Sequence, residues 1–363
     1  MTALMRDHVK LFIPGPVEVS ADTYAAMSKP MIGHRSKDFQ NLYADIQTKL
    51  QTLFGTSQQV YISTSSAWGI MEGSLRNLVK KKVLNCGCGA FSDKWFDVSQ
   101  RCGKNAAELK VEWGQPITAA MIEAKLTTGE FDAVTLVHNE TSTGVLNPLD
   151  EIAALKVKFP DVMFIVDTVS SFTTVPVNFD ALGIDVLLTG SQKAFAMPPG
   201  MALFAASEAA YARAKTIADR GYYFDFIEFQ KNGATSMTPS TPCISLIYGL
   251  QHQLNKFFTE GLDNRYARHA RLNAMVHEWV QKHGFDFFAP AGFRSKSLTC
   301  VKNKDGFDVA NFVSTLKKRH NLAIDGGYGK IKGHTFRISN MGDETEATIK
   351  ELIAALDDTM GAM

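Results

Sequence analysis

Short apolar runs alternate with longer amphipathic segments along the first 260 residues of the chain. The apolar runs predict strands at residues 59–63, 82–85, 133–138, 163–167, 186–189 and 201–205. The segments between them carry apolar residues at helical spacing, so we expect helices at residues 68–80, 93–102, 118–126 and 148–158. Because nearly continuous apolar strands alternate with helices, we predict an α/β fold with a mainly parallel central sheet covered by helices.

The pattern changes near residue 261, where helices begin to flank shorter strands. We expect helices at residues 264–283, 308–320 and 344–360 and strands at 297–301 and 335–339. A helix at residues 244–260 would link the two parts, and Pro14-Gly15-Pro16 favours an extended N-terminal segment. The chain therefore predicts an arm (1–20), a large domain (21–260) and a small α+β domain (261–363).

Composition narrows the class of protein. The 363 residues include 38 Lys and Arg against 37 Asp and Glu, so the basic excess typical of nucleic-acid-binding proteins is missing. The longest weakly polar region, residues 182–206, is interrupted by Asp185, Lys193 and Pro198, which argues against a membrane span. Five scattered cysteines fit neither a disulfide framework nor a metal site. We therefore expect a cytoplasmic protein with reduced thiols, with no nucleic-acid, membrane or metal partner.

Polar residues follow three of the predicted strands, where the ligand site of such a sheet lies. A hydroxyl-rich segment, residues 63–69, leads into a helix and can cradle a phosphate. Asp167 ends the strand at 163–167, and Lys193 follows the strand at 186–189. Taken singly, the hydroxyl-rich segment and Asp167 would each be interpreted as an ordinary helix cap. Lys193 alone would be interpreted as a lysine whose amine reaches solvent along its aliphatic stem.

Taken together, the three features have a more specific explanation. A phosphate cradle, an aspartate and a lysine 26 positions later, each at a strand end, are what pyridoxal 5′-phosphate (PLP) requires. The cradle would hold the phosphate, Asp167 would keep the pyridine nitrogen protonated, and Lys193 would form the imine.

With these motifs the sequence resembles the class V, fold-type I PLP-dependent aminotransferases. Within that family it is similar to alanine–glyoxylate and serine–pyruvate aminotransferases and to the soluble hydrogenase small-subunit proteins. The resemblance covers nearly the whole chain and rests on Pro14-Gly15-Pro16, on residues 138–145, on Val166-Asp167-Thr168-Val169-Ser170-Ser171, on Gly190-Ser191-Gln192-Lys193-Ala194, on Pro198-Pro199-Gly200, on residues 238–242 and on Phe336-Arg337-Ile338-Ser339.

The resemblance implies roles for the residues that would surround the cofactor. Lys193 would carry it as a Schiff base, Asp167 would pair with the pyridinium, Val169 would pack under the ring, and Thr141 would lie near the phenolic oxygen. Phe91 stands at the ring-stacking position. The phosphate would be surrounded by Ser66, Ala67, Trp68 and Gln192, joined by Thr241 from the partner subunit of a homodimer. Trp68 replaces a hydroxyl or histidine of relatives, so its contribution would come from the backbone.

The resemblance also implies substrate contacts and a reaction. Arg337 would grip the substrate α-carboxylate as a bidentate pair, with Gly15 lining the same end of the site. We expect transamination of a small amino acid, alanine or serine, with a 2-oxo acid such as glyoxylate or pyruvate.

Three alternatives remain. A phosphoserine or aspartate aminotransferase using 2-oxoglutarate would employ Arg35 for the extra anion, although Arg35 also fits a surface ion pair. A cysteine desulfurase or lyase is disfavoured because Phe91 replaces the usual histidine, and because Cys300 lies in a predicted strand. A scaffold without cofactor is disfavoured by the intact Asp167 and Lys193.

Overall fold

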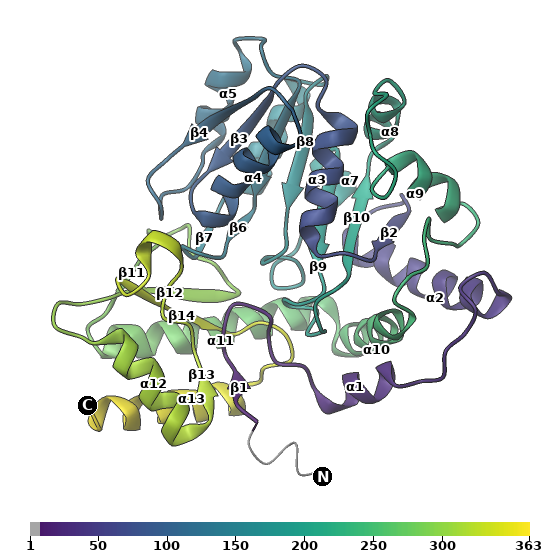
Figure 1. Ribbon diagram of the computed structural model, residues 1–363. Helices are drawn as coiled ribbons and strands as arrows, with labels where there is room; N and C mark the ends of the chain where they lie inside the picture. The colour runs from purple at the N-terminus through teal and green to yellow at the C-terminus, as the bar shows by residue number, and fades with distance from the viewer. Residues whose placement is uncertain (1–7) are drawn as a thin grey trace.

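A seven-stranded sheet forms the centre of the larger part of the molecule (Figure 1). The structure is a computed structural model that describes residues 8–363. The strand order is β2-β10-β9-β8-β5-β3-β4, and all neighbours from β9 to β4 are parallel. The strands are β2 (Val60–Ser63), β3 (Val83–Gly87), β4 (Ala106–Lys110), β5 (Ala133–Val137), β8 (Met163–Asp167), β9 (Val186–Gly190) and β10 (Ala202–Ala206). The predicted α/β fold with a mainly parallel sheet is confirmed.

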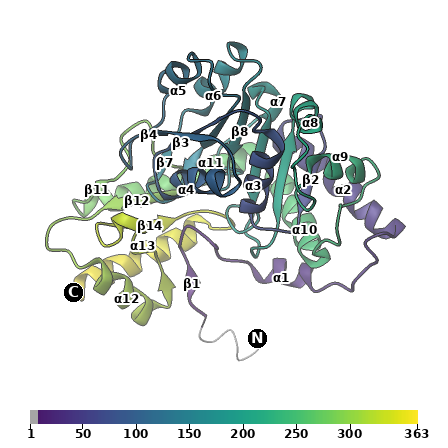
Figure 2. The same ribbon diagram turned by 45° about the horizontal axis from the view of Figure 1, so that its top comes forward.

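Helices cover both faces of this sheet, as Figure 2 shows from a second direction. The two faces alternate along each strand: Phe164 and Val166 of β8 face one hydrophobic cluster, whereas Met163 and Ile165 face the other. The first cluster is completed by α2 (Lys37–Phe54), α5 (Ala119–Leu126), α6 (Leu149–Ala153), α7 (Phe179–Leu182) and α10 (Ile244–Glu260). The second is completed by α3 (Ala67–Leu78), α4 (Ala90–Arg101), α8 (Glu208–Lys215) and α9 (Phe226–Gly233).

The C-terminal part has its own sheet and its own core. β11 (Asp286–Phe287), β12 (Leu298–Lys302) and β14 (Thr335–Ser339) form an antiparallel sheet. It packs with α11 (Leu262–Lys282), α12 (Val309–His320) and α13 (Glu346–Gly361) around a separate apolar cluster. The remaining elements are α1 (Ala21–Met27), the hairpin β6 (Asn139–Glu140) and β7 (Val145–Leu146), and the 3₁₀ turns η2 (Ala154–Val157) and η3 (Gly329–Ile331).

The N-terminal segment joins the C-terminal part. β1 (Lys10–Leu11) pairs in parallel with β13 (Leu322–Ala323), and residues 12–20 then continue without helix or strand toward α1. This agrees with the extended N-terminal segment that Pro14-Gly15-Pro16 predicts. Residues 1–7 of the predicted arm lie outside the described residues. The domain boundaries at 20/21 and 260/261 stay a prediction. Among residues 8–363, no helix has both the length and the apolar character needed to cross a bilayer.

Two features of the large sheet differ from the expectation. β10 runs antiparallel to both of its neighbours, because the eleven residues between β9 and β10 hold no crossover helix and the chain simply turns back. β4 was not predicted, because as an edge strand it is only half-buried and carries polar side chains.

Candidate active site

A cavity of about 340 Å³ lies where the carboxyl ends of β2, β8 and β9 meet the N-terminal segment. It brings together most of the residues predicted from the sequence, namely Gly15, Ser66, Ala67, Trp68, Phe91, Thr141, Asp167, Val169, Gln192 and Lys193. Its other lining residues are Pro16, Met71, Val137, Asn139, Ser170, Pro199 and Tyr328. Three predicted site residues, Arg35, Thr241 and Arg337, do not line it.

Lys193 is buried just beyond the end of β9. Burial lowers the pKa of its amine to about 8, and the nearby positive charge of Arg337 acts in the same direction. The amine donates a hydrogen bond to the carbonyl oxygen of Pro14. Gly15 is required beside it, because a Cβ there would lie 2.7 Å from Lys193 Nζ and its φ of +116° disfavours any other residue. The lowered pKa leaves a larger fraction of Lys193 neutral, and so nucleophilic, than an exposed lysine would have.

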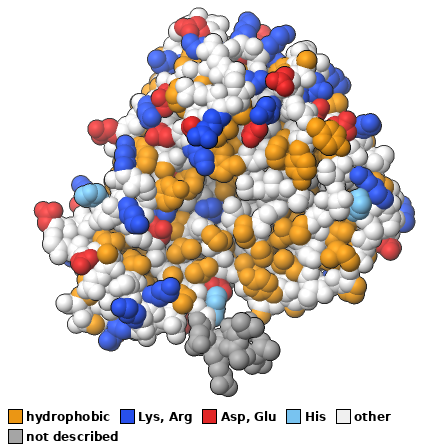
Figure 3. All heavy atoms as spheres, in the orientation of Figure 1, with side chains coloured by type: hydrophobic (Ala, Val, Ile, Leu, Met, Phe, Trp, Pro, Cys, Tyr) orange, Lys and Arg blue, Asp and Glu red, His pale blue; other side chains and the backbone are white. Residues whose placement is uncertain are grey.

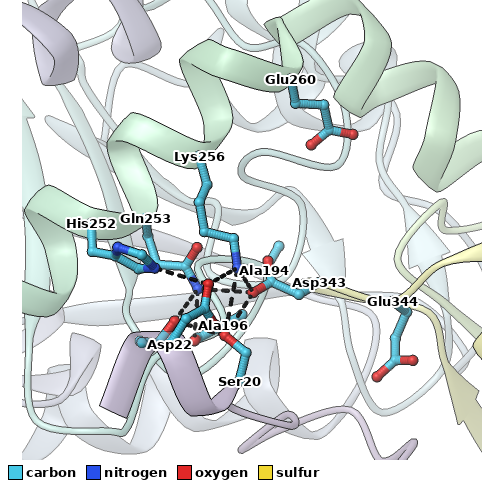
Figure 4. A network of polar contacts seen from close by, with 12 residues as sticks. Ser20, Asp22, Ala194, Ala196, His252, Gln253, Lys256, Glu260, Asp343 and Glu344 are labelled. Carbon is cyan, nitrogen blue, oxygen red and sulfur yellow. Dashed lines mark hydrogen bonds and ion pairs between the residues drawn. The ribbon is translucent and has the colours of Figure 1, made fainter. Parts of the chain in front are cut away.

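A polar network holds the turn that follows this lysine (Figure 4). Gln253 of α10 donates to the carbonyl oxygen of Ala196 at 3.1 Å and contacts Asp343 at 3.2 Å. Arg265 of α11 is fully buried and donates to the carbonyl oxygen of Ala194 at 2.5 Å. Because these contacts come from α10, α11 and the segment after β14, both parts of the molecule fix the backbone next to the lysine.

Asp167 ends β8 with its carboxylate buried in the cavity. Its Oδ1 accepts a hydrogen bond from the backbone N–H of Val169 at 2.8 Å. Burial raises the pKa of this carboxyl to about 7, since little water solvates the anion. A cation placed against Asp167, such as a protonated pyridine nitrogen, would restore the charged form.

The N-terminus of α3 offers an anion cradle. Ser66 occupies the N-cap position, yet its side chain makes no capping hydrogen bond, so its hydroxyl and the first backbone N–H groups of α3 remain free for a ligand. Gln192 lines the same cavity, and the N–H groups of its side-chain amide are the donors that it can offer to an anion. The Trp68 indole packs against Trp95, with ring centroids 6.1 Å apart, which leaves Trp68 a backbone role at the cradle.

Aromatic and hydroxyl side chains complete the walls. Phe91, in the first turn of α4, stacks on Tyr328 with ring centroids 5.1 Å apart. Thr141 and Ser170 share a hydrogen bond of 2.5 Å between their hydroxyl oxygens. Ser170 and Asn139 were not predicted as site residues, although both stand inside the strand-end motifs and were therefore detectable. Tyr328 had a weaker signal, its place in a glycine-rich turn.

Arg337 lies on β14 and does not line the cavity. It contacts two residues that do, Thr141 and Tyr328. Its side chain is 4 % exposed, and its Nε donates to Asp325 Oδ1 at 2.8 Å. Its Nη1 donates to the carbonyl oxygen of Thr141 at 2.9 Å, and the guanidinium lies 5.4 Å from the Tyr328 ring centroid. A guanidinium carries five N–H groups, more than these contacts use, so Arg337 retains donors for a carboxylate.

Arg35 and Thr241 lie together outside the cavity of their own chain. Arg35 donates to the carbonyl oxygens of Thr238 at 3.1 Å and Pro239 at 3.3 Å. The Thr241 hydroxyl is 3.4 Å from His34 Nε2. Within one chain, Arg35 therefore supports the loop that carries Thr241.

The residues of this cavity fit PLP. The uncapped N-terminus of α3 marks a place for the phosphate, the buried Asp167 matches the pyridine nitrogen, and the amine of Lys193 matches the aldehyde.

Comparisons with known proteins agree with this chemistry. A model of the family "Aminotransferase class-V" matches residues 17–352. An uncharacterized aminotransferase of Methanocaldococcus jannaschii is 37 % identical over 351 residues, covering 95 % of this chain and 90 % of the relative. A serine–glyoxylate aminotransferase of Methylorubrum extorquens is 32 % identical, covering 97 % and 90 %. The crystal structure of an alanine–glyoxylate aminotransferase from Nostoc sp. superposes with a TM-score of 0.93 at 27 % identity, covering 99 % and 97 %. The chain belongs to the class-V aminotransferases, and it is a PLP-dependent transaminase of fold type I.

Proposed function

We propose that this transaminase moves the amino group of a small amino acid, serine or alanine, to a 2-oxo acid such as glyoxylate or pyruvate. The observation that carries the proposal is the convergence of Lys193, Asp167 and the uncapped N-terminus of α3 in one cavity of about 340 Å³. The similarity to serine–glyoxylate and alanine–glyoxylate aminotransferases supports the choice of substrates.

The residues predicted from the sequence then have chemical tasks. When bound, PLP supplies an electrophilic carbonyl and a conjugated ring that accepts the electron pair released at the substrate Cα. Lys193 holds the cofactor covalently at rest and afterwards carries the proton at Cα as general base and acid. Asp167 keeps the proton on the pyridine nitrogen. Arg337 binds the substrate carboxylate, and Gly15 leaves room for the lysine to move.

The remaining predicted residues hold the cofactor. Ser66, Ala67, Trp68 and Gln192 bind the phosphate, and Val169 and Phe91 enclose the ring. Thr141 would lie near the phenolic oxygen, and its hydroxyl contacts that of Ser170.

The other reactions of this fold have less support. Arg35, which would bind a second acidic group, lies outside the cavity in its own chain and contacts loop carbonyls. Cys300 is buried in β12, where its thiol contacts the carbonyl oxygen of Ser142 at 3.6 Å, so it lacks the mobility that a desulfurase cysteine needs.

We also propose a homodimer whose partner supplies Thr241 to the site. Hydrophobic side chains gather over α1 and α10 on the face seen in Figure 3. Tyr24 of α1 and Met31 are large exposed apolar residues, and so are Tyr222 and Tyr223, which precede α9. Sedimentation should give twice the mass of one chain, and dilution to monomers should release PLP. A monomer that retains PLP at all concentrations would contradict this arrangement.

A cytoplasmic location completes the proposal. All five cysteines are free, and three of them, Cys86, Cys88 and Cys300, are buried thiols. Unpaired cysteines are typical of a reducing compartment. Cell fractionation with a cytoplasmic marker enzyme tests the location.

A substrate panel tests the reaction. Purified protein loaded with PLP is assayed with serine, alanine, aspartate, phosphoserine and cysteine against glyoxylate, pyruvate and 2-oxoglutarate. We expect the highest kcat/KM for serine or alanine with glyoxylate or pyruvate. Lys193→Ala should show no turnover. Lys104→Ala is the matched control, because it removes a half-buried lysine outside the cavity, and its turnover should be normal. A preference for phosphoserine or aspartate with 2-oxoglutarate, or release of sulfur from cysteine, would refute the proposed substrates.

A further inference from the structure

One buried carboxylate near the cavity has no task in the proposed reaction. Glu140 ends β6 and is completely buried. Its Oε1 accepts hydrogen bonds from the Ser142 N–H at 3.0 Å and the Ser142 hydroxyl at 2.7 Å. Its Oε2 accepts from the Ser92 N–H and the Ser92 hydroxyl, both at 2.8 Å. Within residues 8–363 no basic side chain forms an ion pair with it, and the hydrogen bonds that it accepts come from neutral donors.

These contacts fix the start of α4. The N–H of Phe91 points to Glu140 Oε1 at 3.4 Å, and the N–H of Ala90 donates to the Ser142 hydroxyl at 2.9 Å. With the N–H of Ser92, the first three N–H groups of the helix are satisfied by this carboxylate and its neighbour. Gly89 permits the approach, since a Cβ there would lie 2.4 Å from Glu140 Cγ. Phe91, which lines the cavity, is therefore held through its backbone.

The charge of Glu140 reaches the cavity as well. It contributes to the raised pKa of Asp167, and it opposes the lowering of the Lys193 pKa. The other charged groups that act on Lys193 are Arg337, which lowers its pKa, and Asp167 and Asp325, which raise it. Because Glu140 is buried, salt and water screen this field only weakly.

We propose that Glu140 is a positioning residue: its carboxylate anchors Phe91 at the cofactor ring and supplies a fixed negative charge to the Lys193–Asp167 pair. The anchoring acts through the backbone of α4, and the charge acts through space. This inference rests on the proposed placement of PLP against Phe91, Asp167 and Lys193. It assigns two separable effects to one side chain, so variants that alter only one of them can be compared.

The first measurement is the pH titration of the bound cofactor by its absorbance. Glu140→Gln removes the charge, and the midpoint should fall by roughly half a pH unit or more, because a cation at Lys193 loses a nearby anion. Glu140→Asp keeps the charge but shortens the side chain, so its midpoint should stay close to that of the wild type. Ser142→Ala removes hydrogen bonds without removing charge and is the matched control, again with an unchanged midpoint.

The second measurement is the PLP dissociation constant by equilibrium dialysis. Glu140→Gln and Glu140→Asp should each weaken PLP binding about tenfold, which corresponds to about 1.4 kcal/mol. In the background of Phe91→Ala, the same changes should cost much less, because the anchored ring is already absent.

The possible failures are distinguishable. A wild-type protein that binds no PLP would refute the proposed function itself. A wild-type protein that binds PLP, together with a Glu140→Gln midpoint equal to that of wild type, would overturn the electrostatic effect. Additive losses of Glu140→Asp and Phe91→Ala would overturn the anchoring. If Glu140→Gln does not fold, Glu140→Asp still tests the anchoring through its double variant with Phe91→Ala, and a Glu140→Asp midpoint that falls by roughly half a pH unit or more would overturn the charge effect.

Discussion

The contact between Gly15 and Lys193 gives a sharp prediction for Gly15→Ala. The added Cβ would lie 2.7 Å from both Lys193 Cδ and Nζ, far inside van der Waals contact. Overpacking of this kind costs about 1–3 kcal/mol. The φ of +116° adds a backbone cost of about 1–2 kcal/mol, partly offset by about 0.4–1 kcal/mol from the stiffer unfolded chain. We expect the free energy of unfolding to fall by about 1–5 kcal/mol.

The chain can also respond by lifting the N-terminal segment away from the lysine. In that case the loss of stability is smaller, but Lys193 loses its contact with the Pro14 carbonyl and its fixed position. Urea unfolding followed by tryptophan fluorescence measures the first response. The rate at which the cofactor-free protein takes up PLP, with borohydride trapping at Lys193, measures the second. Gly15→Ala must lower the free energy of unfolding, change the rate of PLP uptake, or do both.

Gly33→Ala provides the matched control. A Cβ at residue 33 would meet only Ser36 Cβ at 3.7 Å, an ordinary contact, and its φ lies outside the left-handed region. Its stability should stay within about 0.5 kcal/mol of the wild type. If Gly15→Ala matches Gly33→Ala in both stability and PLP uptake, the close approach of the segment to Lys193 is wrong.

Three further predictions concern the charged groups. Arg337→Lys loses the planar guanidinium fork, so the KM for the amino donor should rise about tenfold or more while the PLP dissociation constant stays unchanged. An unchanged KM in steady-state kinetics would argue against the carboxylate contact. Asp167→Asn keeps the shape but not the anion, so kcat should fall about 100-fold or more in the same assay, and a variant with normal kcat would remove its role. PLP uptake by the cofactor-free protein should accelerate as the pH rises through about 8 and then level off, because only the neutral Lys193 amine attacks. Stopped-flow absorbance measures the rate of uptake, and a rate that does not change with pH would contradict the lowered pKa of Lys193.

The central residues of the site could be predicted because the sheet is parallel. Ser66, Asp167 and Lys193 lie far apart in sequence, but each follows an apolar strand, and such ends collect at one edge of the sheet. The periodicity of the strands therefore located the cavity before any contact was known. The resemblance to a family supplied the tasks of these residues, which periodicity alone could not provide.

Other features have no comparable signal in the sequence. The antiparallel direction of β10 depends on the path of a loop, and side-chain alternation is the same for both directions. Tyr328 reaches the cavity from the C-terminal part, so its place depends on how the two parts pack. The anchoring of Phe91 by Glu140 needs the exact approach of β6 to α4, although the motif containing Glu140 was recognisable.

The parallel pairing of β1 with β13 has a consequence for the order in which the molecule folds. Lys10 pairs with Leu322, which lies 312 positions further along the chain. Contacts of such long sequence separation close a large loop and therefore form slowly. Because the same N-terminal segment goes on to lie against Lys193, this slow pairing also brings the cover of the reactive lysine into place. Completion of the active site is thereby tied to the joining of two distant segments of the chain.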